Sequence, residues 1–577
     1  MNIKNIFPFL DWLPNYKKSW FKDDFFAGIT IGVMLIPQGI AYAMIAGLPP
    51  IYGLYTAMIP QIVYVFLGTS RQLAIGPAAM DSLIVLSGVS VLATVGSENF
   101  IVLAILLAFF VGLFQIAFGF FRLGFLVNFL SKPVISGFTS GSAIIIAMNQ
   151  IGNLLDIDVD RTNLFHELLM NVFEQLGTFH WQSLILGSVA IVILLLLKKY
   201  FKKIPASLVV VILGIFIVYL LKLDQKGISI LGEIPTGLPK FIIPTFDLSL
   251  IQDLSGLALT LALIGFMEAI SIAKSIEIKH NDYKVKPNKE LIALGFGNIV
   301  GSFFQTYPAT AGFARTAVND QTGAKTPLSS LVAAIIIAIS LLFLTPAFYY
   351  LPKSILAAII IVAAYGLLDF SMPKKLLSFN LRDLIILNVT FFVTIFIGIK
   401  EGILFGVILS LAMLIYKSTK PHIAVLGNVS GTIFYRNINR FENLKIKKEI
   451  LIIRFDAQLH FANTTYFKDK LQEFAKQKGG NLKLIIIDGE SLNALDSSAI
   501  YAIDEIHDYF TRLEVIVAFT GLKGPVRDAL EHSGLIKKIK YDHCFMSIQD
   551  AIDSYENKSL HFSKKYGYQE YIKQTNG

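Results

Sequence analysis

The chain has 577 residues, of which 54% are apolar and only 16% are charged, and its mean hydropathy is +0.62. An ordinary soluble domain carries about 25% charged residues, so this composition excludes a chain that is soluble throughout. The net charge of +9 does not indicate a nucleic-acid partner, because the basic residues lie in short clusters between apolar runs. A single cysteine, Cys544, excludes an intrachain disulfide and a cysteine-based metal site.

Residues 1–22 combine tryptophan and lysine and predict a cytosolic, interfacial segment that is not cleaved. Apolar runs then predict fourteen spans in a transport domain over 23–420, with one set of seven in 23–222 and a second set in 250–418. Several of the runs are too short to cross a membrane alone. The first set is expected as two helices in 25–70, hinged at Pro49-Pro50, followed by 73–95, 100–120, 133–151, 182–197 and 205–221. The second set is expected at 254–273, 291–304, 308–318, 327–346, 354–368, 384–399 and 403–416.

Lysine and arginine gather in alternate short loops, for example at 274–289, whereas the loop after the fifth run is acidic. Because basic loops stay on the cytoplasmic side, both termini are predicted to be cytoplasmic. Low cysteine use and the absence of a targeting signal fit a bacterial inner membrane.

Each set of seven is interrupted in its third member, at 74–78 (AIGPA) and at 306–312 (TYPATAG). An odd number of spans per set makes the two halves inverted repeats, and matched broken helices in such repeats mark a binding site near the membrane midplane. The alternative is a pair of ordinary proline kinks.

A half-helix that begins after Gly76, and another near Gly312, would present unpaired N–H groups and positive dipole ends, which favour an anion. Arg315 adds a full positive charge near the second break. Alternatively, Arg315 snorkels from a helix end or pairs with Glu268.

Glu268 is the most deeply placed acidic residue and is predicted to bind a coupling ion, because an anion beside a carboxylate requires a proton or Na⁺ to neutralise it. The alternative is a structural Glu268–Arg315 pair without a transported cation. Asp81 is either a second coupling carboxylate or a partner of a helix dipole. Gln38 and Tyr42 lie four residues apart on one helix face and could bind a ligand or pack helices.

Several motifs that are typical of enzymes are absent from the sequence or have the wrong spacing. The glycines of 295–301 have the wrong spacing for a dinucleotide loop and lie in an apolar span, where small residues favour helix packing. No Gly-Lys pair is present for a Walker A loop, and the histidines show no metal-ligand spacing. The sequence therefore predicts a secondary transporter rather than an enzyme, with no metal or other cofactor apart from coupling H⁺ or Na⁺.

After Lys420-Pro421 the composition becomes that of a soluble domain in which strand and helix patterns alternate, which predicts a small α/β domain over 421–556. The final residues, 557–577, are predicted to be a flexible basic tail. Strands are expected at 449–459, 483–488 and 514–520. Helices are expected at 463–478, 497–512, 524–532 and 547–555.

Two segments of the first half, 36–55 (IPQGIAYAMIAGLPPIYGLY) and 68–77 (GTSRQLAIGP), strongly resemble the signature of the sulfate permease (SulP) family of anion transporters. Residues 312–319 (GFARTAVN) and 323–327 (GAKTP) extend the likeness into the second half. The C-terminal domain resembles a STAS domain at 461–463 (FAN) and 495–498 (LDSS).

This resemblance implies a polytopic α-helical fold of fourteen spans as a seven-plus-seven inverted repeat, with half-helices at spans 3 and 10. Spans 1–4 and 8–11 would form a core that moves against a gate of spans 5–7 and 12–14, usually in a homodimer. It also implies that the anion lies between the two half-helices and that Glu268 takes part in coupling. The expected anion contacts are Gln38, Tyr42, Gly76, Pro77, Ala78, Ala311, Gly312, Phe313, Ala314 and Arg315.

Ala314 and Gly312 stand where relatives often have serine, so backbone N–H groups are expected to replace hydroxyl contacts. By analogy with single-domain STAS proteins, Ser497 is a possible phosphorylation site, although a serine at a helix start also serves as an N-cap. The STAS domain is expected to dock, to stabilise the dimer or to bind a cytosolic regulatory partner.

The sequence thus predicts an elevator-type symporter of sulfate, bicarbonate or a dicarboxylate. An anion exchanger or channel of the same fold, a nucleobase carrier and a signalling membrane protein are the alternatives that the sequence leaves open.

Overall fold

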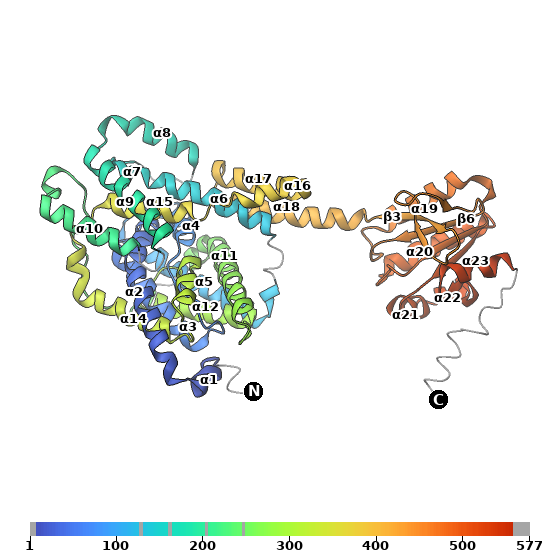
Figure 1. Cartoon of the computed structure of the whole chain (residues 1–577), viewed down its shortest axis with the longest axis horizontal. Helices are drawn as coiled ribbons and strands as arrows, with labels where there is room; N and C mark the ends of the chain where they lie inside the picture. Colours follow the sequence, from blue (N-terminus) through green and yellow to red (C-terminus); the bar gives the residue numbers. More distant parts are fainter. Residues whose placement is uncertain (1–6, 126–130, 160–163, 202–205, 245–247, 558–577) are drawn as a thin grey trace. The chain divides into compact units, whose positions relative to one another are not determined.

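The structure is a computed structural model that describes residues 7–125, 131–159, 164–201, 206–244 and 248–557. The chain forms two compact units, Met1–Ser410 and Leu411–Gly577, whose boundary falls within helix α18 (Figure 1). The first unit consists mainly of helices, and the second contains a seven-stranded sheet. Residues 1–6 of the predicted interfacial segment and residues 558–577 of the predicted tail lie outside the described residues.

The predicted apolar runs form helices, and most bounds lie within a few residues of the expected ones. Helix Leu248–His280 extends beyond the expected 254–273, and Ala79–Val89 is shorter than the expected 73–95. The elements of the first half are α1 (Phe9–Trp12), α2 (Lys18–Ile45), α3 (Pro50–Leu67), β1 (Ile75–Gly76), α4 (Ala79–Val89), α5 (Glu98–Phe120), α6 (Lys132–Asn149), α7 (Ile151–Leu155), α8 (Phe165–Gln175), α9 (Trp181–Tyr200) and α10 (Ala206–Leu221). Those of the second half are α11 (Leu248–His280), α12 (Pro287–Ser302), β2 (Thr310–Ala311), α13 (Phe313–Gln321), α14 (Leu328–Ile339), α15 (Lys353–Tyr365), α16 (Ser371–Phe379), α17 (Leu381–Phe396) and α18 (Ile399–Thr419).

Eight helical stretches of the described chain are long and apolar enough to cross a membrane by themselves. Six shorter helices, α4, α10, α12, α13, α15 and α17, complete the fourteen membrane elements of the predicted fold class. The third and tenth elements, α4 and α13, have only 11 and 9 residues. At about 1.5 Å per residue, each is roughly half as long as the hydrocarbon core of about 30 Å.

Two groups of helices correspond to the expected core and gate. In the first group α5 packs on α12, and α2 packs on both α14 and α3. In the second, α6 packs on α17 and α15 packs on α9. Figure 1 shows the first group around α2, α5 and α12 and the second around α6, α9 and α15.

Glycine pairs allow the closest helix contacts of the first group. A Cβ atom added at Gly112 of α5 would lie 2.5 Å from the carbonyl oxygen of Gly295 in α12, and one added at Gly295 would lie 2.7 Å from the carbonyl oxygen of Gly112. Gly39 and Gly53 bring α2 and α3 together in the same way. The glycines of 295–301 therefore serve helix packing, as expected from their place in an apolar span.

The second unit contains a mixed sheet with the strand order β4-β3-β6-β7-β8-β9, and β5 also pairs with β3. Strands β6 to β9 are parallel, and β3 is antiparallel to β6. The strands are β3 (Ile423–Val429), β4 (Tyr435–Asn437), β5 (Leu444–Lys445), β6 (Ile450–Phe455), β7 (Leu484–Asp488), β8 (Ile516–Thr520) and β9 (Cys544–Phe545). The helices are α19 (Thr464–Lys478), α20 (Ser497–Arg512), α21 (Gly524–His532), α22 (Leu535–Ile539) and α23 (Ile548–Glu556).

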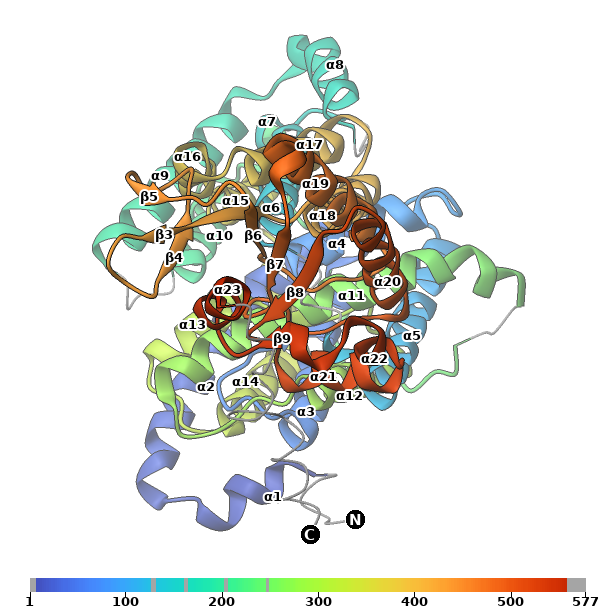
Figure 2. The ribbon, with the colours of Figure 1, turned by 90° about the vertical axis from the view of Figure 1, so that its right-hand side faces the viewer.

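The central strands of this sheet are buried on both sides. Their side chains are therefore apolar on both faces. Ile485 and Ile487 of β7 face a core that includes α19 to α22, and Leu484 and Ile486 face a smaller core that includes α23. Figure 2 shows α23 on the other side of the strands from α20 and α22.

The structure also contains elements that were not predicted. Helices α8 and α16 join spans, and Met170 and Phe173 of α8 are 62% and 68% exposed. Strands β3 to β5 precede the first predicted strand, and that strand ends at Phe455 rather than at Leu459, which forms an isolated bridge with Leu495. Strands β4 and β5 have only three and two residues, so they leave almost no apolar pattern in the sequence.

Candidate functional site

The two interruptions predicted in spans 3 and 10 meet in the structure as a short antiparallel ladder. Ile75 of β1 pairs with Ala311 of β2, and Gly76 pairs with Thr310. The Gly312 N–H extends this ladder by donating to the Ala74 carbonyl oxygen at 3.1 Å. The two segments are therefore chain breaks that pair with one another, rather than independent proline kinks.

Each strand of the ladder leads directly into a half-helix. Helix α4 begins at Ala79 and α13 begins at Phe313, and no side chain of the described residues caps either N-terminus. The first-turn N–H groups of a helix have no partner within the helix and carry its positive dipole end. Since both helices start within a few residues of the ladder, two such ends lie next to it.

Arg315 joins the two breaks. Its Nη1 donates to the Pro77 carbonyl oxygen at 2.5 Å and its Nη2 donates to the Thr310 carbonyl oxygen at 3.3 Å. The residue is 2% exposed and covers Gly312, where an added Cβ would lie 2.5 Å from the guanidinium carbon. Arg315 does not snorkel, because its side chain is buried. Within the described chain it forms no ion pair with Glu268, although the two groups interact electrostatically, so their pairing stays an alternative.

The side chains at the start of α13 differ in orientation. Phe313 is 67% exposed and Ala314 is also exposed, whereas Arg315 is buried toward the ladder. An anion at this helix end would therefore meet backbone N–H groups and an aromatic ring, with the guanidinium charge behind them. The Nε atom of Arg315 has no hydrogen-bond partner among the described residues.

Helix α2 passes beside the ladder and carries two predicted contacts. The Leu35 Cδ2 atom lies 3.5 Å from the position that a Cβ would take at Gly76. Gln38 and Tyr42, one and two turns further on, are 7% and 8% exposed. The Gln38 Oε1 atom lacks a partner in the described chain, and the Tyr42 hydroxyl interacts electrostatically with Arg315. Both side chains thus remain candidate ligands.

The structure also brings both predicted carboxylates to the ladder. Thr310 donates from its hydroxyl to the Gly265 carbonyl oxygen at 2.7 Å, which ties α11 to β2. A Cβ added at Gly265 would lie 3.6 Å from Asp81 Oδ2, and Glu268 follows one turn later on α11. Asp81 and Glu268 interact electrostatically with each other and with Arg315. Asp81 Oδ1 has no hydrogen-bond partner in the described residues and does not cap α4.

Polar side chains that were not predicted from the sequence hold the ladder in place. Thr316 accepts from the Ala74 N–H at 3.1 Å, and Asn319 Nδ2 donates to the Gln72 carbonyl oxygen at 2.8 Å. Asn298 forms hydrogen bonds to both the N–H and the carbonyl group of Ala309. An asparagine inside an apolar run was the sequence signal that could have indicated such a contact, because a buried amide group requires hydrogen-bond partners.

Two fully buried carboxylates hold loops near the ends of spans, and neither was predicted from the sequence. Asp24 accepts the N–H groups of Lys325 and Thr326 at 2.7 and 3.0 Å. Glu290 accepts the Thr69 N–H at 2.7 Å and the Tyr64 hydroxyl at 2.6 Å. Glu290 thus stabilises the loop that leads into β1 and α4, and Asp24 stabilises the loop that follows α13.

The predicted phosphorylation site, Ser497, is the exposed first residue of α20. The expectation that it serves as the N-cap is wrong, because Asp496 takes that position and its Oδ1 accepts the Ala499 N–H at 2.8 Å. Asp496 Oδ2 also accepts the Phe461 N–H at 2.8 Å. The phosphorylation of Ser497 stays a prediction.

The fold and the paired breaks define a polytopic membrane protein of the permease class with an appended STAS domain. A profile of the sulfate permease family matches residues 21–390, and a STAS domain profile matches residues 441–551. The chain therefore belongs to the sulfate permease family, which is a family of transporters and not of enzymes.

Two curated relatives cover nearly the whole chain. Sulfate transporter 4.1, chloroplastic, of Arabidopsis thaliana is 38% identical over 98% of this chain and 86% of the relative. High affinity sulfate transporter 2 of Stylosanthes hamata is 32% identical over 97% of this chain and 88% of the relative. Both are plant proteins, so they give no support to the predicted bacterial inner membrane, whereas a multi-pass membrane protein is confirmed.

Solved structures agree with the fold. The murine Solute Carrier 26 family member A9 anion transporter, in the inward-facing state, has a TM-score of 0.89 at 26% identity and covers 96% of this chain and 94% of its own. The transmembrane domain of the cyanobacterium bicarbonate transporter BicA has a TM-score of 0.60 at 24% identity, over 69% of this chain and 98% of its own. The predicted fold of fourteen spans with a core, a gate and a STAS domain is thereby confirmed.

Proposed function

We propose that this protein is a secondary active transporter of small oxyanions, with sulfate as its principal substrate. The observation that carries the proposal is the pair of uncapped half-helix N-termini beside the β1–β2 ladder, with Arg315 behind them. Backbone N–H groups and positive dipole ends suit a small anion. They do not provide the directional hydrogen bonds that a planar nucleobase would need. The relatives named as sulfate transporters support sulfate over bicarbonate or a dicarboxylate.

We further propose that transport is coupled to a cation, and that the cation is H⁺. Two carboxylates, Asp81 and Glu268, and one guanidinium, Arg315, interact electrostatically at the site. If all three are ionised, they carry a net charge of −1, and a sulfate dianion would add two further negative charges. Charge is costly inside the membrane, so neutralisation of Glu268 by a proton would allow the anion to bind.

Na⁺ is the alternative coupling ion. It would require several oxygen ligands around one point, whereas a proton requires only one carboxylate oxygen.

The transport cycle is proposed to be an elevator movement in which the core helices, with the ladder and both half-helices, shift against the gate helices. The hydrogen bonds of Arg315 to both breaks support movement of the half-helices as one body. We also propose that the protein is a homodimer and that both of its termini lie in the cytoplasm.

Flux measurements in proteoliposomes test this function. Sulfate, bicarbonate, chloride, nitrate, succinate and uracil are each supplied with an imposed pH gradient, an imposed Na⁺ gradient or no gradient. We expect concentrative sulfate uptake that depends on the pH gradient and is inhibited by selenate. Uptake of uracil without competition by anions would support a nucleobase carrier instead. A sulfate current that follows voltage without accumulation would support a channel, and obligatory counter-transport without a cation gradient would support an exchanger.

A further inference from the structure

A cavity of about 350 Å³ opens at one end of the STAS sheet and has an unusual concentration of arginine. It lies where the start of β3, the end of β6 and the turn after β4 meet. The lining residues are His422, Arg436, Asn437, Arg440, Phe441, Arg454 and Asp456. Three guanidinium groups and one carboxylate give this cavity a net charge of +2 with neutral histidine.

The single carboxylate of the cavity is already engaged. Asp456 Oδ1 accepts from Arg454 Nε at 2.5 Å, and Asp456 Oδ2 lies 2.8 Å from His422 Nδ1. These hydrogen bonds outweigh the effect of partial burial and lower the pKa of the Asp456 carboxyl. Arg454 also interacts electrostatically with Asp488 and Glu490, so its charge is largely balanced.

The uncompensated charge therefore belongs to Arg436 and Arg440, both of which are exposed. Arg436 donates from Nη1 to the Tyr435 carbonyl oxygen at 3.1 Å, and its guanidinium lies 5.7 Å from the centre of the Phe434 ring. These contacts orient the side chain without neutralising it. No described residue provides a hydrogen bond or ion pair to the Arg440 guanidinium. Two guanidinium groups that have no carboxylate partner at one cavity suit an anion with several oxygens.

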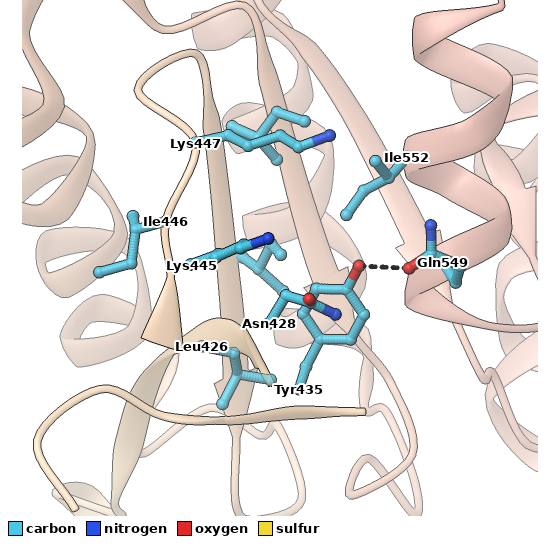
Figure 3. A pocket seen from close by; sticks show the side chains of 10 residues that line it. Leu426, Asn428, Tyr435, Lys445, Ile446, Lys447, Gln549 and Ile552 are labelled. Atoms are coloured by element: carbon cyan, nitrogen blue, oxygen red, sulfur yellow. Dashed lines mark hydrogen bonds between the residues drawn. The ribbon is translucent and has the colours of Figure 1, made fainter. Parts of the chain in front are cut away.

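The neighbouring cavity on the same strands has a different character (Figure 3). It has a volume of about 130 Å³, half of its lining residues are Leu or Ile, and Lys445 and Lys447 also line it. Tyr435 donates to Gln549 Oε1 at 2.7 Å across it, and Lys447 is paired with Glu556. The excess of unpaired positive charge thus distinguishes the arginine-lined cavity from this one.

We propose that the arginine-lined cavity is a binding site for a phosphate group, with Arg436 and Arg440 as its principal contacts. This inference is independent of the transport function. The phosphate could belong to a lipid headgroup or to a soluble phosphate compound. A headgroup is within reach, because His422 follows the last residue of α18, Thr419, by three residues, which span at most about 10 Å of extended chain.

Calorimetric titration of the full-length protein in an uncharged detergent tests the site. The probes are dioctanoyl phosphatidic acid for a headgroup, pyrophosphate for a soluble phosphate, and dioctanoyl phosphatidylcholine as a zwitterionic control. We expect the variant Arg436→Gln/Arg440→Gln to bind the preferred anionic probe about tenfold more weakly than the wild type, because two charge-assisted contacts are lost. The affinity of the wild type should also fall with added salt.

Two further variants separate this result from misfolding and from general attraction to a basic protein. Arg512→Gln/Lys476→Gln removes the same charge from exposed positions outside the cavity and should change the affinity by less than about twofold. Asp456→Asn removes the only lining carboxylate and should tighten binding by about threefold, the opposite of what a damaged domain would give.

Preference for phosphatidic acid would assign the site to a headgroup, and preference for pyrophosphate would assign it to a soluble compound. Either result supports the site if the variants respond as expected. The inference is overturned if neither anionic probe binds, if Arg436→Gln/Arg440→Gln binds like the wild type, or if the Arg512→Gln/Lys476→Gln control loses affinity equally. Sulfate flux should be unchanged in every one of these variants, so failure here is distinguishable from failure of the proposed transport function.

Discussion

Arg315 and Pro77 are separated by more than two hundred residues, yet the Arg315 Nη1 atom lies 2.5 Å from the Pro77 carbonyl oxygen. Pro77 precedes α4 and Arg315 lies in the first turn of α13, so this hydrogen bond connects the two inverted halves at their breaks. The second hydrogen bond of Arg315, to Thr310, holds the β2 strand of the same ladder. The guanidinium therefore both positions the half-helices and places a positive charge behind them.

Replacing Arg315 should affect both properties. Arg315→Ala removes a donor to two buried carbonyl oxygens and also removes the charge, so we expect the half-saturation concentration for sulfate to rise by about tenfold or more. Arg315→Lys keeps the charge but cannot form the two-pronged contact, and an intermediate value is expected. The exposed residue Arg382 provides the control variant Arg382→Ala. Unchanged half-saturation in Arg315→Ala, measured by radiolabelled uptake, would contradict a role in binding.

Glu268→Gln should separate transport from its driving gradient. The substitution keeps the size of the side chain but removes the group that exchanges a proton, so sulfate should still equilibrate across the membrane without being concentrated. The measurement is uptake into proteoliposomes with and without a pH gradient. Asp253→Asn, on the same helix at an exposed position, is the matched control. If Glu268→Gln still accumulates sulfate fully in response to the gradient, the coupling role is wrong.

The contact between α5 and α12 should not tolerate a methyl group. In Gly112→Ala the new Cβ would lie 2.5 Å from the Gly295 carbonyl oxygen and 2.7 Å from Ile299 Cγ1, and overpacking of this kind costs about 1–3 kcal/mol. We therefore expect a lower unfolding temperature in detergent. In Gly256→Ala of α11 the added Cβ would meet no atom of the described residues within 4 Å, so this variant should be neutral or stabilising. Equal unfolding temperatures for the two variants would show that the helices can separate without cost.

The STAS unit should lose stability as the pH falls below neutrality. Burial of His543, together with the positive charges of Lys540 and His507, lowers the pKa of its imidazole. The unfolded state then binds more protons than the folded state, so stability falls as the pH drops through the unfolded pKa of about 6.5 toward the lowered folded value. Hydrogen exchange of the STAS residues in the full-length protein at pH 7.5 and about 5.5 measures this effect. His543→Asn should reduce the difference between the two pH values, and an undiminished difference would assign it to other groups.

The membrane spans could be predicted from the sequence because a long run of apolar residues without charges is stable in few settings besides a lipid bilayer. The break in the third element was also predictable, since Gly76 and Pro77 interrupt an apolar run, and the matching position of Gly312 pointed to an inverted repeat. The central parallel strands of the STAS domain were predicted for a similar reason, because strands buried on both faces are continuous apolar segments.

The contacts that complete the site could not be predicted in this way. Strands β1 and β2 have two residues each and pair across more than two hundred residues of chain, which leaves no local pattern to recognise. The partners of Arg315 are backbone carbonyl groups, which every residue carries, so its sequence neighbours do not reveal them. The buried carboxylate of Asp24 was likewise hidden among interfacial charges at the start of α2.

An electron cryo-microscopy map of the protein in the presence of selenate tests the central claim most directly. Selenate has the shape and charge of sulfate and scatters more strongly. The account predicts selenate density beside the β1–β2 ladder, about 2.7–3.2 Å from the first-turn N–H groups of α4 and α13. Selenate bound elsewhere in the membrane unit, or helix ends whose N–H groups are occupied by protein side chains while selenate is transported, would contradict it.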